Sequence, residues 1–188
     1  MLETLPGVAR RALKTTGRRD VEGMLVTNHV LSGAVIGAAS RRRPASAFAL
    51  GVLSHFALDA TPHWGKWNGR PNFMQVAVPD GLVGLAVMGT VTVLAPRDAR
   101  VAVLAGMAGA ALPDLDKPSI LFFGRSPFPR VVDRLHMRIQ HEAPHRLKYE
   151  LAAAAIFLAA AVGLLHGQRK GFAFSGPPGR CRGTRSPR

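Results

Sequence analysis

Five apolar segments, separated by breaks rich in proline and arginine, constrain the fold of this 188-residue chain more than any other feature. They cover residues 25–39, 44–60, 76–95, 101–112 and 151–165. A helix needs about 20 residues, within a range of roughly 17 to 25, to cross the hydrocarbon core of a bilayer. The third segment has that length, the second and fifth reach it with flanking residues, and the first and fourth are short.

This pattern predicts an all-α fold, a polytopic membrane helical bundle of about four to five hydrophobic helices. Five thin spans and three spans with two half-inserted helices both fit the segment lengths, and a soluble, alanine-rich helical bundle is the alternative. Hydrophobic residues make up 47% of the chain but aromatic residues only 6%, a mixture suited to close helix packing in lipid. The arginines and lysines do not decide the orientation of the spans.

The net charge of +14 raises the possibility of a nucleic-acid partner, because basic proteins neutralise phosphates. The positive residues, however, lie in the two tails and between the apolar segments, where they would flank membrane spans near anionic head groups. The lipid bilayer is therefore the expected partner, nucleic acid is not expected, and the predicted location is the inner or plasma membrane, as a multi-pass protein.

Three regions follow from the distribution of polar residues. Residues 1–23 form a basic N-terminal arm and residues 167–188 a basic C-terminal tail, both predicted to be disordered, around a membrane helical domain at residues 24–166. Met24 directly precedes the first apolar segment, so a start at Met1 and a start at Met24 both remain open. The single cysteine, Cys181, excludes an intrachain disulfide framework.

The second apolar segment carries His55, Asp59 and His63, each four residues from the next. That spacing places side chains on one face of a helix, and histidine with carboxylate is a ligand set for zinc or a harder divalent ion. Pro62 is expected to end the helix, so His63 would come from the turn beyond it. The alternative is structural, with His63 capping the helix and His55 satisfied by hydrogen bonds.

Further ionisable residues stand at the ends of the other apolar segments. Such groups are costly in an apolar run and usually face a cavity or the bundle interior. Each alone could be a helix cap, but together they predict one polar pocket that binds a divalent metal ion, with zinc as the first candidate. The additional candidate ligands are His29, Asp80, Asp114 and Asp116.

The connection at residues 114–150 adds His136, Gln140 and Glu142. A helix around residues 130–140 is expected to be amphipathic and to lie on the membrane surface. His136 is a candidate metal ligand, although a solvated amphipathic helix explains the same residues. The chain lacks a phosphate loop, an H-E-x-x-H motif and a G-x-S-x-G elbow. Metal-activated water is therefore the leading mechanism for an enzyme, with Asp59 or Glu142 as the catalytic carboxylate that takes the proton.

Three short motifs resemble those of the YdjM-like bacterial membrane proteins, which are described as membrane-bound metal-dependent hydrolases. They are Asn-His-Val-Leu-Ser-Gly at residues 28–33, Leu-Ser-His-Phe-Ala-Leu-Asp at residues 53–59 and Ala-Leu-Pro-Asp-Leu-Asp at residues 111–116. The resemblance covers roughly residues 24–155. It implies a multi-helix inner-membrane protein with metal ligands at His29, His55, Asp59, Asp114 and Asp116.

The chain departs from that family after the Pro-Asp-x-Asp element. The H-R-G-x-T-H-S stretch usual in the family is missing, and His136-x3-Gln140-x-Glu142 stands in its place. This replacement resembles an uncharacterised branch of small membrane proteins with H-x-x-I-Q near the last helix, and it bears on the chemistry more than on the fold. The sequence therefore supports two candidate functions. The first is a metal-dependent hydrolase acting on a phospho- or lipid-linked substrate. The second is a non-enzymatic multi-pass membrane protein whose polar residues are structural or bind a partner.

Overall fold

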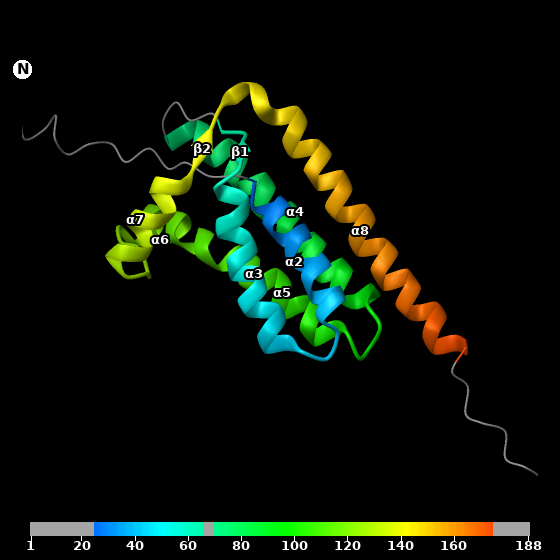
Figure 1. Ribbon diagram of the computed structural model, residues 1–188. Coiled ribbons are helices and arrows are strands. Elements are labelled where there is room, and N and C mark those ends of the chain that lie inside the picture. Colours follow the sequence, from blue (N-terminus) through cyan, green and yellow to red (C-terminus); the bar gives the residue numbers. More distant parts are fainter. Residues whose placement is uncertain (1–24, 66–69, 175–188) are drawn as a thin grey trace, which may run out of the picture.

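The computed structural model describes residues 25–65 and 70–174, which fold into helices joined by short connections (Figure 1). The long helices are α2 (Val26–Ser40), α3 (Pro44–Asp59), α4 (Arg70–Leu94), α5 (Arg100–Ala111) and α8 (Leu147–Phe174). Between α5 and α8 lie the 3₁₀ turn η1 (Leu112–Leu115), the short helices α6 (Asp116–Phe123) and α7 (Arg130–Ile139), and the turn η2 (Pro144–Arg146). The predicted all-α fold class is therefore confirmed.

One pair of two-residue strands was not predicted from the sequence. β1 (Pro62–His63) runs parallel to β2 (His141–Glu142), with Pro62 opposite His141 and His63 opposite Glu142. The pair ties the chain after α3 to the chain before α8. We call the end of the bundle at which it lies the β1 end, and the opposite end, which holds the Arg41–Asp98 ion pair, the Arg41 end.

Helices α2, α3 and α5 form the centre of the bundle because glycines let their backbones touch. A Cβ atom added at Gly33 or Gly51 would collide with the carbonyl of Gly106 on α5, and one added at Gly109 would collide with the carbonyl of Phe48 on α3. Small residues at helix crossings allow this close approach, which gives van der Waals packing without bulky side chains. The alanine- and glycine-rich composition thus sets the tight spacing of these three helices.

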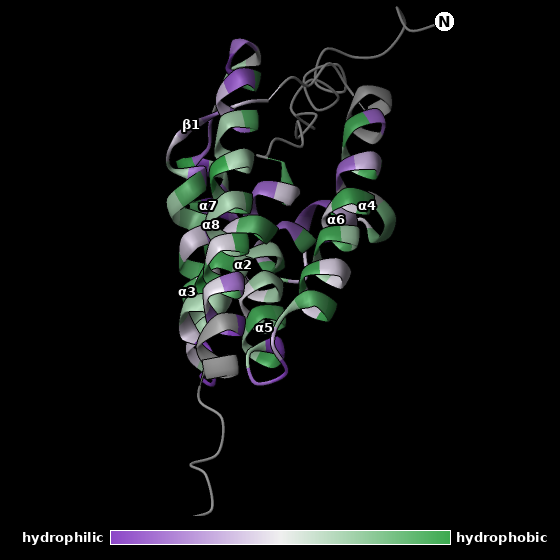
Figure 2. Ribbon diagram, turned by 90° about the vertical axis from the view of Figure 1, so that its right-hand side faces the viewer, coloured by the Kyte–Doolittle hydropathy of each residue, from purple (hydrophilic) through white to green (hydrophobic). Residues whose placement is uncertain are grey.

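Helices α4 and α8 both pack against α2 (Figures 1 and 2). Large apolar side chains of these outer helices face outward, for example Leu85 at 66% exposure and Ile156 at 66%. Figure 2 shows hydrophobic colours along much of the helix walls and hydrophilic colours gathered towards their ends. Water-soluble proteins rarely combine an apolar exterior with fully buried histidine and aspartate.

Two helical stretches, Gln75–Leu94 and Leu147–Arg169, are long and apolar enough to cross a membrane. Only 6% and 17% of their most apolar windows are buried within the bundle, so neither is the core helix of a water-soluble fold. Helices α2, α3 and α5, at 15, 16 and 12 residues, are shorter than a complete span.

The predicted boundaries fit the central helices closely and the outer helices less well. Helix α4 begins at Arg70, before the predicted apolar segment, and contains Pro79. Helix α8 continues to Phe174, beyond residue 167, where the basic tail was predicted to begin. Tertiary contacts explain the difference: Gln168 donates to the carbonyl of Ala38 at 2.7 Å, and Arg169 donates to the carbonyl of Leu94. The predicted N-terminal arm (residues 1–23) and the rest of the tail (residues 175–188) lie outside the described residues.

We expect Gly106→Ala to lower the free energy of unfolding by about 1–3 kcal/mol, because the new methyl group forces α2 away from α5. Gly89→Ala on α4 is the matched control, since nothing lies within 4 Å of a Cβ atom there. Thermal unfolding of detergent-purified protein measures both. Equal stability of the two variants would show that the α2–α5 contact does not hold the bundle together.

Candidate metal centre

Histidines and aspartates from five elements of structure meet at the β1 end of the bundle. His29 lies near the start of α2, and His55 and Asp59 lie in the last turns of α3. The others follow α5, with Asp114 in η1, Asp116 at the first position of α6 and His136 on the inner face of α7. All six side chains are buried or nearly so.

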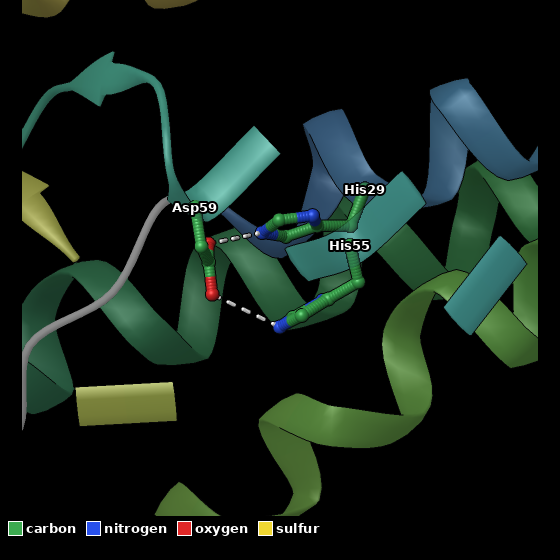
Figure 3. A group of neighbouring side chains, drawn as sticks. All are labelled: His29, His55 and Asp59. Atoms are coloured by element: carbon green, nitrogen blue, oxygen red, sulfur yellow. Dashed lines mark ion pairs between the residues drawn. The ribbon is translucent and has the colours of Figure 1, made fainter. Parts of the chain in front are cut away.

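His29, His55 and Asp59 form the first group that could hold a metal ion (Figure 3). The two imidazole rings stack with centroids 4.0 Å apart, and both direct a nitrogen towards the carboxylate of Asp59. His29 Nε2 lies 3.3 Å from Asp59 Oδ1, and His55 Nε2 lies 3.1 Å from Asp59 Oδ2. The four-residue spacing of His55 and Asp59 therefore places them on one helix face, as the sequence predicts.

His55, Asp114 and His136 form a second group that shares His55 with the first. His136 Nε2 lies 3.1 Å from His55 Nε2 and 2.8 Å from Asp59 Oδ2. Asp114 Oδ1 lies 3.9 Å from the Nε2 atoms of both His55 and His136. Within each group all ligand atoms lie within 4.8 Å of one another, and the shared His55 makes the two groups one cluster.

The hydrogen bonds behind the rings decide which nitrogen faces the cluster. His55 Nδ1 lies 2.8 Å from the carbonyl oxygen of Ala110, which can only accept, so Nδ1 carries the hydrogen. His136 Nδ1 lies 3.2 Å from Asp116 Oδ2, the usual partner of a metal-binding imidazole. In neutral rings both Nε2 atoms then present lone pairs to the cluster. Asp116 accordingly orients His136 from behind, whereas the sequence predicted Asp116 to be a metal ligand itself.

A cation among these atoms would resolve two otherwise unfavourable features. Lone pairs on two imidazole nitrogens 3.1 Å apart repel unless a proton or a cation lies between them. His29 Nε2 and Asp59 Oδ1 are buried and lie 3.3 Å apart, but they form no hydrogen bond within the described residues. Buried polar atoms almost always have a partner, and a bound cation would satisfy both of these atoms.

The distances between the ligand atoms also fit a bound metal ion. Ligands at about 2.0–2.1 Å around a tetrahedral zinc ion lie about 3.3 Å from one another. The cluster has separations of 2.8, 3.1, 3.1 and 3.3 Å, with Asp114 farther out at 3.9 Å. Imidazole and carboxylate together suit zinc and also other first-row divalent ions, so the ligand set defines a class of metal and not one element.

Charge on the α6–α7 side of the cluster is arranged around Lys117 and His136. Lys117 forms an ion pair with Asp114. Burial lowers the pKa of Lys117, but the nearby carboxylates of Asp114 and Asp116 outweigh burial and raise it. Burial likewise lowers the pKa of His136, whereas its contacts with Asp116 and Asp59 raise it to about 9 overall. Without a metal ion, His136 therefore carries the proton that holds the carboxylates together.

Besides Asp116, three predicted site residues lie outside these two groups. Asp80 accepts hydrogen bonds from the backbone N–H groups of Val26 and Thr27, at 2.6 and 3.3 Å, and so caps the N-terminus of α2 from another helix. His63 is buried in β1, with Nδ1 2.8 Å from the carbonyl oxygen of Thr61. Glu142 lies beside His63 in β2, and its side chain is outside the described part of the chain.

Two polar residues near the site were not among the predicted ligands or catalytic residues. Glu150, at 2% exposure, accepts a hydrogen bond from the Trp64 N–H at 3.2 Å and another from the Asn28 side chain. It therefore braces α8 against the chain on either side of the site, and a carboxylate opening an apolar helix was the available signal. Lys117 directly follows Asp116, but the sequence does not show that its ammonium group turns back to Asp114.

Comparisons of the chain with protein-family models, with curated proteins and with solved structures give no match. The described residues thus define the class of site by their own geometry, as a buried cluster of histidine and aspartate that could hold a metal ion.

We expect Asp116→Asn to weaken metal binding by roughly 10- to 100-fold, because it removes the carboxylate that orients His136. Asp98→Asn removes a carboxylate at the Arg41 end and should leave the affinity unchanged. Competition with a chromophoric chelator measures both dissociation constants on detergent-purified protein. Equal affinities would exclude the orienting role of Asp116.

Proposed function

We propose that this chain is a multi-pass membrane protein of the YdjM-like type. In this proposal its buried centre binds a divalent cation and hydrolyses a phospho- or lipid-linked substrate at the membrane surface. The observation that carries the proposal is the convergence of three imidazoles and two carboxylates, with the Nε2 atoms of His55 and His136 turned inward by their partners. Membership of the YdjM-like family, which rests on three short motifs, is part of the proposal.

The distribution of apolar surface supports the membrane location. Exposed leucines and valines cover α4 and α8, the two helices long enough to span a bilayer. The central helices α2, α3 and α5 are shorter, but α2 and α3 bury ionisable groups against each other as membrane proteins do at functional sites. Their flanking arginines, such as Arg41 and Arg42, are exposed at the opposite end and suit a head-group region.

The residues divide into binding and proton-transfer roles. His55, Asp114 and His136, the second of the two groups, would hold the ion, which when bound lowers the pKa of a water molecule towards neutrality. Asp59, whose oxygens lie 2.8–3.3 Å from three imidazole nitrogens, is placed to accept the proton. Lys117, paired with Asp114, would supply positive charge to an anionic substrate arriving on the Asp114 side, where these two side chains are 12% and 11% exposed.

A non-enzymatic role is the second candidate, and closure of the site favours it. His29 and His55 are fully buried, and Asp59 is 1% exposed. Structural metal sites are closed, whereas catalytic sites keep one position open to water or substrate. In this alternative a bound cation, or protons on the histidines in its place, hold α2, α3, η1 and α7 together, and no substrate reaches the cluster.

Membrane location predicts that the full chain remains in the pellet after membranes are washed with alkaline carbonate, because the apolar walls of α4 and α8 are in lipid. Immunoblotting of pellet and supernatant reads the result. Release of most of the protein into the supernatant would contradict the location while leaving the metal site open to test.

The metal centre predicts about one equivalent of divalent metal per chain in detergent-purified protein, measured by elemental analysis. The double variant His55→Ala/Asp59→Ala should lose it, and Asp98→Asn should keep it. Less than half an equivalent in the parent protein after incubation with zinc, manganese or iron salts would overturn the proposal.

If the protein is a hydrolase, we expect metal-dependent release of phosphate or alcohol from phosphate esters presented in mixed micelles. Asp59→Asn should lower kcat by about 10²- to 10⁴-fold, the range for loss of a general base. Lys117→Gln should mainly raise KM for the anionic substrate. A stoichiometric metal ion with no turnover, combined with a lower Tm after chelation, would instead establish the structural role.

A further inference from the structure

Helix α7 has one face in the metal centre and another face that nothing in the described chain covers. His136 is 2% exposed on the inner face, against His55 and the edge of Phe56. Arg130, Arg134 and Arg138 are exposed and spaced four residues apart, so they form one stripe along the helix. The helix that completes the site therefore carries a continuous basic edge.

An apolar ridge runs beside this stripe. Val131 and Leu135 are 64% and 52% exposed, and their positions lie next to the arginines around the helix. The preceding helix, α6, ends in Phe122 and Phe123, which are 66% and 78% exposed. Exposed aromatic and aliphatic side chains next to arginines are typical of a helix lying in the plane of a membrane interface.

The described part of the protein does not neutralise the arginine stripe. Within the described residues, none of Arg130, Arg134 and Arg138 forms an ion pair. Asp133, the acidic residue of α7, accepts a hydrogen bond from the hydroxyl of Ser126 at 2.7 Å. Three uncompensated positive charges thus face outward and would attract a surface of negative charge.

The position of the α6–α7 segment in the fold identifies that surface. The segment leaves α5 through η1 and returns to α8 through β2, so it is attached at the β1 end (Figure 1). The apolar wall of α8 begins just beyond it, with Leu151 at 61% exposure. If these walls lie in hydrocarbon, α7 lies at the depth of the head groups, where basic residues meet anionic lipid. An acidic protein partner would match the arginines but not the adjoining apolar ridge.

We propose that the α6–α7 segment docks on the head groups of anionic phospholipids, with the three arginines at the phosphates and Val131 and Leu135 at the acyl boundary. When the α6–α7 segment is docked, the lipid surface lies on the outer face of α7 and keeps His136, on its inner face, next to the metal centre. The proposal rests on the membrane location within the proposed function, and it names the surface from which a lipid-linked substrate reaches the site.

The test uses the full chain in nanodiscs of phosphatidylcholine, with or without phosphatidylglycerol. In a Cys181→Ser background, an environment-sensitive fluorophore is attached at Leu135→Cys or at Met137→Cys. These positions are matched because both are about half exposed, at 52% and 55%. Met137 nevertheless points about 140° away from the Val131–Leu135 ridge.

We expect nitroxide-bearing lipids to quench the label at position 135 at least roughly twofold more than the label at position 137, and aqueous iodide to show the reverse order. In discs containing phosphatidylglycerol, Arg130→Gln/Arg134→Gln/Arg138→Gln should reduce lipid quenching at position 135. The charge-matched variant Arg41→Gln/Arg42→Gln/Arg43→Gln at the other end should not.

The outcomes separate this proposal from the proposed function. Failure of the chain to enter nanodiscs would remove the membrane location, and absence of bound metal in discs would remove the metal centre. Insertion with normal metal content but equal lipid quenching at the two positions would overturn the docking proposal alone. Equal quenching in neutral and anionic discs, unchanged by the arginine variant, would overturn the role of anionic head groups.

Discussion

The burial of Asp59 among three histidines is the interaction on which the rest of the structure depends. A buried carboxylate is costly unless positive charge and hydrogen-bond donors surround it. Here Asp59 lies within 3.3 Å of imidazole nitrogens from α2, α3 and α7. A proton or a cation must therefore be shared within the cluster. This requirement links helices that otherwise meet mainly through small apolar side chains.

The close packing of the central helices makes that cluster possible. Gly33, Gly51 and Gly106 bring the backbones of α2, α3 and α5 together, so that His29 and His55 stack at 4.0 Å. The same approach places the Ala110 carbonyl where it can fix the tautomer of His55. The fold thus buries polar groups inside and leaves large apolar side chains outside, an arrangement stable where the surroundings are themselves apolar. The helix packing and the electrostatics of the site are therefore consequences of one arrangement.

The segment that closes the site differs in character from the helices that build it. Helix α7 supplies His136 from a short amphipathic element, and Asp116 and Lys117 come from the start of α6. Because α7 turns an arginine stripe outward and His136 Nε2 inward, its position links the candidate metal centre to the molecular surface. In the docking proposal this segment would meet the lipid head groups, whereas the α2–α3–α5 core is fixed by backbone contact.

The sequence alone determined the helical class, the segment boundaries of α2, α3 and α5, and the grouping of His55 with Asp59, because helical periodicity and apolar run length are local properties. It also indicated that His29 and Asp114 belong to the same site, since ionisable groups at the ends of apolar helices tend to face one interior. For His136 it left two interpretations open, a metal ligand and a solvated amphipathic helix. Only the tertiary structure decided that Asp116 stands behind His136, that Asp80 caps α2, that Glu150 braces α8 and that α8 continues past residue 167. Each of these depends on contacts between residues far apart in the chain or on the direction of a side chain. Neither is encoded in local spacing, because both are set by how the glycine-lined helices cross.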